Sequence, residues 1–274
     1  MLKKEALFLE ATKNSGQPFH LVDFSSWPAF ASLGAFCATL GGVRALQGYF
    51  DGVRLCRIGV SIIILGSAFW WRDVTREARY QGLHRRRVTQ GMRWGMILFI
   101  ISEIFFFVAF FWAYFHSSLA PTIELGGVWP PKGLNVLDAW GVPWLNTVVL
   151  VSSGVRLTWA HYGVLSGYHY SIKIGLMITL VLAVAFTILQ VGEYYETSFS
   201  LADGIYGSTF FLATGFHGFH VLIGTSFLYV CLGRFLLNHF RADHHFGFEG
   251  AVWYWHFVDV VWLFLFGALY WWGS

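Results

Sequence analysis

The sequence carries little charge. Asp, Glu, Lys and Arg make up 12% of its 274 residues, whereas soluble domains contain about 25%. Hydrophobic residues reach 56%, and the mean hydropathy is +0.56. These values exclude an ordinary soluble domain and indicate a membrane protein. The net charge of +3 indicates no particular partner, and we expect no nucleic acid.

Cysteine is also scarce. Cys37, Cys56 and Cys231 stand singly in apolar runs, without a CxxC pair, which excludes a disulfide framework or cysteine metal site and favours buried thiols. The sequence contains no Walker loop, nucleophile elbow, HExxH or CxxCH motif. No reaction centre is recognisable, so the chain is expected to be a subunit of a larger machine.

The first nineteen residues mix lysine with glutamate and lack the apolar core of a signal peptide. We expect residues 1–19 to form an aqueous tail and residues 20–274 to form a single transmembrane domain.

Seven apolar runs follow, each close to the 20 or so residues that cross a bilayer. Continuous runs of this length must satisfy their backbone internally, as helices do. The run near Arg54 and Arg57 is the weakest, although both side chains can reach the interface from a first helical turn. The sequence predicts an all-α polytopic membrane protein with seven transmembrane helices, over residues 27–46, 53–71, 90–116, 142–165, 170–197, 204–237 and 247–272.

Most of the 18 basic residues precede the first run or follow the second, fourth and sixth. Lys and Arg concentrate on the negative side of a membrane. We therefore expect the N-terminus in the mitochondrial matrix, or in the cytoplasm of a bacterium, and the C-terminus across the membrane. Several acids, among them Glu193 and Glu196, are expected on that far side.

Glu103 is the only charge in MILFIISEIFFFVAFFWAYF, Met96 to Phe115. An ionisable residue inside a membrane segment is a functional hypothesis by default. Glu103 could exchange protons, accept a hydrogen bond from a lipid head group, or serve only in packing as a protonated carboxyl. We expect it to be neutral unless a cation or a hydrogen-bond donor lies nearby.

Other polar residues also fall inside the runs. His217 and His220 lie three apart on one helical face, a spacing that can hold a metal or haem, but no second pair of matching depth exists and nearby glycines favour packing. His256 and Asp259 are expected to bond each other. Arg156 needs a carboxylate, backbone carbonyls or a subunit interface, and the sequence does not name which.

The connection after the second run is strongly basic, WWRDVTREARYQGLHRRRVTQGMR. It is a topology signal, and it also suits lipid phosphate, because arginine binds phosphate through a fork of donors and basic membrane-edge pockets hold anionic lipids. The two interpretations are compatible.

Long motifs resemble subunit III of the cytochrome c oxidases, in its mitochondrial form. The similarity covers residues 20–274 in order. It rests on HLVDFSSWP, WWRDVTRE, ILFIISE, HSSLAPTIELGGVWPPKG, YGSTFFLATGFHGFHVLIG, HHFGFE and WYWHFVDVVWLFLF followed by YWWGS.

The resemblance implies a helix pair and a five-helix group around a V-shaped cleft filled with phospholipid. It implies no metal in this chain, with haem a, haem a3 and copper in the catalytic subunit I of complex IV. The complex would lie in the mitochondrial inner membrane, or in a bacterial plasma membrane, where it would oxidise cytochrome c, reduce oxygen and pump protons. This subunit would support proton uptake and turnover stability.

By the same resemblance, Glu103 matches a buried carboxylate that faces the cleft. The lipid head-group contacts would be Trp71, Arg76, His84, Arg234 and His239. The chain departs from the family where GLH replaces GHH at residues 82–84, where Tyr162 replaces a histidine, and at Arg156.

Three alternatives are weighed against this interpretation. One is a free-standing proton or solute transporter that uses Glu103 and Arg156. Another is a membrane cytochrome with haem on His217 or His220, and the third is the equivalent subunit of a quinol oxidase.

Overall fold

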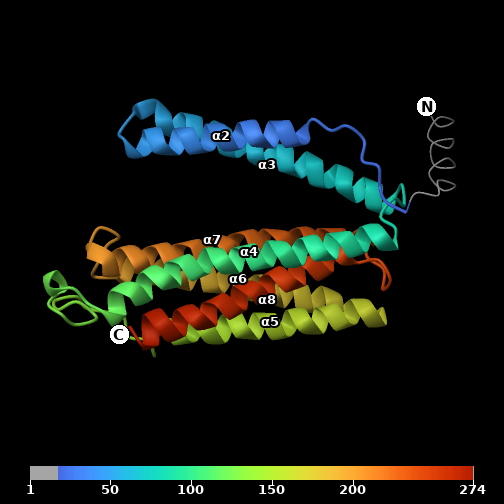
Figure 1. The fold of residues 1–274 in the computed structure, drawn as a ribbon. Helices are drawn as coiled ribbons and strands as arrows, with labels where there is room; N and C mark the ends of the chain where they lie inside the picture. The colour runs from blue at the N-terminus through green and yellow to red at the C-terminus, as the bar shows by residue number, and fades with distance from the viewer. Residues whose placement is uncertain (1–17, 274) are drawn as a thin grey trace. The chain divides into compact units, whose positions relative to one another are not determined.

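The computed structural model describes residues 18–273, so most of the predicted aqueous tail lies outside the described residues. Within them the fold is all-helical (Figure 1). A 3₁₀ turn, η1 (Ile123–Leu125), follows α4, and a π-helical turn, η2 (Phe266–Trp271), continues α8. Residues 18–273 hold seven α-helices, which are α2 (Trp27–Leu46), α3 (Phe50–Arg79), α4 (Arg86–Leu119), α5 (Val142–Ser166), α6 (His169–Glu196), α7 (Gly204–Leu236) and α8 (Phe246–Leu265).

The predicted helices are present, and the bounds of α2, α5, α6 and α7 agree with the prediction to within a residue. The clearest difference is α3, which runs two turns past the predicted end at residue 71 to Arg79. The added segment, RDVTREAR, contains good helix formers and needs no lipid to be stable as a helix. The prediction of a connection there was wrong, and Arg76 and Glu77 lie on the helix.

Six helices of the described chain are long and apolar enough to cross a membrane, namely α2, α3, α4, α6, α7 and α8 with its continuation. The protein is therefore a multi-pass membrane protein. The remaining helix, α5, has 25 residues but is less apolar, because it carries Asn146, Thr147 and Ser153, which are buried against other helices. Its role as a seventh span stays a prediction.

The chain divides into two compact units, residues 1–92 and 93–274. The first holds α2 and α3, and the second holds α4 from Arg93 onward together with α5 to α8. The predicted division into a helix pair and a five-helix group is confirmed, whereas the lipid-filled cleft stays a prediction.

In the first unit, glycines bring the backbones of α2 and α3 together. A Cβ atom added at Gly59 would collide with the backbone of Ala38, and one added at Gly52 would collide with the backbone of Ala45. Such close approach by small residues is the usual packing of helices in membranes, where lipid competes equally for larger apolar side chains.

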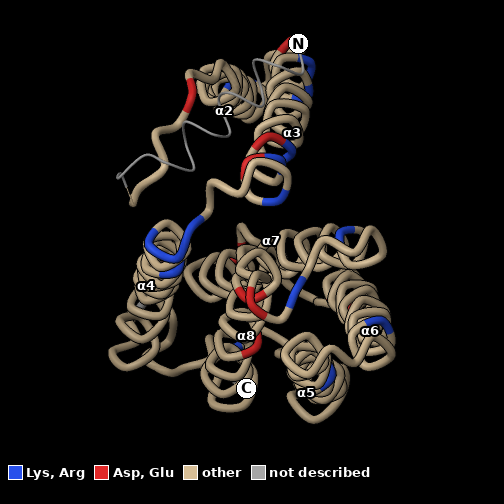
Figure 2. Tube along the Cα trace, turned by 90° about the vertical axis from the view of Figure 1, so that its right-hand side faces the viewer, with Lys and Arg blue, Asp and Glu red and all other residues tan. Residues whose placement is uncertain are grey.

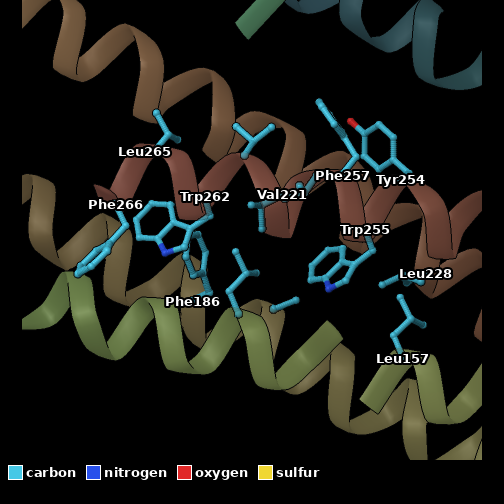
Figure 3. Packing of buried hydrophobic residues seen from close by; sticks show 14 of the residues in the cluster. Leu157, Phe186, Val221, Leu228, Tyr254, Trp255, Phe257, Trp262, Leu265 and Phe266 are labelled. Atoms are coloured by element: carbon cyan, nitrogen blue, oxygen red, sulfur yellow. The ribbon is translucent and has the colours of Figure 1, made fainter. Parts of the chain in front are cut away.

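In the second unit, α8 lies between α4, α5 and α7 when the helices are viewed along their axes (Figure 2). Trp255 and Trp262 of α8 are fully buried and point toward α5 (Figure 3). The Trp255 indole Nε1 donates to Ser153 Oγ, and the Trp262 Nε1 donates to Thr147 Oγ1, each over 2.9 Å. The polar residues of α5 are thus partners for the aromatic side chains of α8.

The glycine contact predicts a stability difference between two similar substitutions. Gly59→Ala should destabilise the helix pair by about 1–3 kcal/mol, the usual effect of overpacking, because the added methyl group meets the Ala38 backbone. Gly42→Ala is the matched control, since nothing lies within 4 Å of a Cβ atom there. The measurement is the midpoint of thermal aggregation of the detergent-solubilised protein. A Gly59→Ala protein as stable as Gly42→Ala would contradict this packing.

Candidate functional site: a buried carboxyl–imidazole pair and a basic membrane edge

Glu103 of α4 lies against His220 of α7. The Glu103 Oε2 atom is 2.8 Å from the His220 Nε2 atom, and the side chains are 22% and 9% exposed, respectively. The expected partner of Glu103, a nearby donor or cation, is therefore an imidazole 117 positions away in the chain.

The other nitrogen of His220 determines where the protons lie. Nδ1 is 2.6 Å from the backbone oxygen of Phe216, which can only accept a hydrogen bond, so Nδ1 carries a proton. The short contact between Nε2 and Glu103 then requires one further proton. That proton lies either on the carboxyl, with a neutral imidazole, or on Nε2, with an imidazolium facing a carboxylate. In both forms the pair is neutral overall and holds one shareable proton.

Aromatic rings surround this pair. The ring centroids of Phe106, Phe107, Tyr254 and Phe257 all lie within 6.3 Å of the His220 ring. These apolar rings lower the local dielectric around the imidazole, and a lower dielectric strengthens its hydrogen bond with Glu103.

His217, by contrast, lies against a different group. Its Nε2 atom is 3.1 Å from the backbone oxygen of Val258, and its ring packs on Phe186 and Trp262. The two histidines of GFHGFH therefore share a helical face but have separate protein partners. The interpretation of the motif as packing agrees with this arrangement.

The expected contact between His256 and Asp259 is confirmed. Their Nδ1 and Oδ2 atoms are 3.4 Å apart, and the His256 Nε2 atom is 3.1 Å from Thr158 Oγ1 of α5. Arg156 lies on the exposed face of α5, and no hydrogen-bond or ion-pair partner for it is found among residues 18–273. The prediction that Arg156 needs a carboxylate, backbone carbonyls or a subunit interface therefore stays a prediction.

A buried polar cluster surrounds Glu193 and was not predicted. The side of the membrane expected for this acid stays a prediction. Glu193 is 2% exposed and accepts a hydrogen bond of 2.6 Å from the Tyr270 hydroxyl. Gln190 donates to the same hydroxyl over 3.4 Å, and Asn146 donates to Gln190. The spacing of Gln190 and Glu193, one turn apart on α6, was the available signal for a shared buried face.

The residues expected to contact lipid divide between the two units. Trp71 is 68% exposed, and Arg76 is exposed near the end of α3, while His84 lies in the following loop. In the second unit, the Arg234 guanidinium lies 4.8 Å from the Phe240 ring centroid, and the His239 amide donates to the Arg234 carbonyl over 2.9 Å.

Arginine residues are concentrated at the end of α3 and the start of α4, while most of the trace is uncharged (Figure 2). The cluster comprises Arg72, Arg76, Arg79, Arg85, Arg86 and Arg87.

These features define an all-α, multi-pass membrane protein with a neutral carboxyl–imidazole pair inside its helices. A family model described as cytochrome c oxidase subunit III matches residues 17–274. The chain is 57% identical to cytochrome c oxidase subunit 3 of Marchantia polymorpha, over 94% of this chain and 97% of the relative. It is 58% identical to the same-named protein of Prototheca wickerhamii, over 94% and 98%, and 56% identical to that of Drosophila melanogaster, over 95% and 99%. The chain belongs to the cytochrome c oxidase subunit III family, as the motifs had indicated.

Proposed function

We propose that the chain is an integral subunit of cytochrome c oxidase, the terminal oxidase that passes electrons from cytochrome c to oxygen and pumps protons. The observation that carries this proposal is the family match over residues 17–274, with relatives of that name at 53–58% identity. Neither a free-standing transporter nor a membrane cytochrome is favoured by that match.

The chain supplies no catalytic centre in this proposal. Haem a, haem a3 and copper belong to the catalytic subunit I. The contacts of His217 with a backbone carbonyl and of His220 with Glu103 support this assignment, because both imidazoles already have protein partners. The complex would lie in the mitochondrial inner membrane with the N-terminus in the matrix, as the distribution of basic residues favours.

The Glu103–His220 pair would handle protons on behalf of the catalytic subunit. It holds one proton that can lie on either side chain without a change in net charge, so moving that proton requires little reorganisation of the apolar surroundings. Release of that proton to a neighbouring group would leave one negative charge on the pair, and uptake of a proton would restore its neutrality. Exchange of this kind during turnover would support proton uptake and protect the complex from inactivation.

Glu103→Gln tests that role. The amide keeps the shape of the carboxyl and can still donate to the His220 Nε2 atom, but it cannot pass its proton on. We expect a several-fold shorter lifetime during sustained turnover and a lower proton-to-electron ratio. Both are measured on the complex reconstituted in liposomes with cytochrome c as the electron donor.

Glu196→Gln is the control, because Glu196 lies exposed at the end of α6. Unchanged pumping and unchanged lifetime in Glu103→Gln would refute proton handling by the pair while leaving the subunit assignment intact.

Phospholipid head groups would be held at the basic membrane edge. An exposed indole at Trp71 suits the interface, and the guanidinium groups of Arg76 and Arg234 suit phosphate. His84 and His239 would supply further donors close to these arginines in the sequence.

The double variant Arg76→Ala with Arg234→Ala should reduce the phospholipid that co-purifies with the complex, measured by quantitative lipid mass spectrometry. Each arginine lost removes a charge-assisted contact of about 1.5–3 kcal/mol. Arg54→Ala with Arg57→Ala changes the charge equally at two exposed arginines of the opposite predicted side. Equal lipid content in both double variants would mean that Arg76 and Arg234 do not anchor it.

A further inference from the structure

A second constellation lies in the first unit, apart from the Glu103–His220 pair. His20 precedes α2, Glu77 lies in the last turn of α3, and His84 lies in the loop after that helix. One candidate ligand atom from each of the three side chains lies within 4.8 Å of the other two. All three side chains are partly buried, with His20 at 9% and Glu77 at 23% exposure.

The separation of His20 and Glu77 leaves room for an ion between them. The His20 Nδ1 atom is 4.0 Å from the Glu77 Oε2 atom, which is longer than a hydrogen bond. Ligands bound to zinc at about 2.0–2.2 Å in a tetrahedron stand about 3.4 Å apart. Small side-chain rotations therefore bring the three donors to bonding distance from a shared centre.

The donor types select the class of ion. Two imidazoles and one carboxylate suit zinc and ferrous iron, whereas magnesium and calcium prefer all-oxygen sets. Zinc is the ion we test, because it needs no redox partner. The surrounding segment is rich in arginine, and only one ligand is anionic, so binding cannot rest on charge alone. A transition metal also binds neutral imidazole nitrogen, and this coordination compensates for the repulsion by the nearby arginines.

We propose that His20, Glu77 and His84 bind a zinc ion with three protein ligands and a fourth position open to water. The ion would join the segment before α2 to the end of α3 and the loop beyond it. The outermost ligands, His20 and His84, are 64 residues apart in the sequence. A bound ion would therefore link the start of the helix pair in the chain to its end.

The test measures zinc bound to the whole complex. The tagged complex is stripped with a chelator, equilibrated by dialysis against micromolar zinc, and counted for zinc per haem by mass spectrometry. His20→Ala and Glu77→Gln should each weaken the extra zinc site about tenfold or more, since even outer-shell changes have effects of 10–100-fold. Glu77→His replaces one zinc ligand by another and should keep the site.

His169→Ala is the control, because His169 is an exposed imidazole at the start of α6, outside the cluster. Haem content monitors assembly in every variant, and Glu77→Gln keeps the size of the side chain if His20→Ala fails to assemble. The proposal is overturned if His20→Ala and Glu77→Gln bind zinc as the parent does. It is also overturned if His169→Ala loses as much zinc as they do.

Discussion

Hydrogen bonds between α8 and its neighbours organise the second unit, because hydrocarbon offers no partner to a polar group. The Trp255 and Trp262 indoles donate to Ser153 and Thr147 of α5, and the Tyr270 hydroxyl donates to Glu193 of α6. These bonds fix the depth and rotation of α8 between the surrounding helices. Once α8 is fixed, its aromatic side chains Tyr254 and Phe257 form part of the wall around the His220 ring.

The same constraint explains the pairing of Glu103 with His220. A lone carboxylate facing lipid would be costly, but a carboxyl and an imidazole that share one proton are neutral together and satisfy each other. The proton can move between them without exposing a net charge to the apolar surroundings. A group with this property suits the proton handling proposed above, and the same hydrogen bond satisfies two polar side chains among apolar helices.

The sequence was sufficient for the helices but not for their contacts. Apolar runs bounded by charges, proline or glycine placed α2, α5, α6 and α7, whereas the last turns of α3 were missed because RDVTREAR is helical without being apolar. Glu103 stood out as a lone charge, but its partner could not be named, since that requires the relative rotation of α4 and α7. The burial of Glu193 was not predicted, because an acid at the end of a span resembles an aqueous one until Tyr270 is seen to bond it.

In our proposal this chain works as a subunit of an oxidase whose redox centres lie in another subunit. The most direct measurement is purification through a tag on this chain in mild detergent, followed by a reduced-minus-oxidised difference spectrum before and after the chain is separated from its partners. We expect haem a bands in a larger complex and none on the separated chain. A pure chain that never associates with haem a, or one that keeps a haem spectrum of its own, would contradict it.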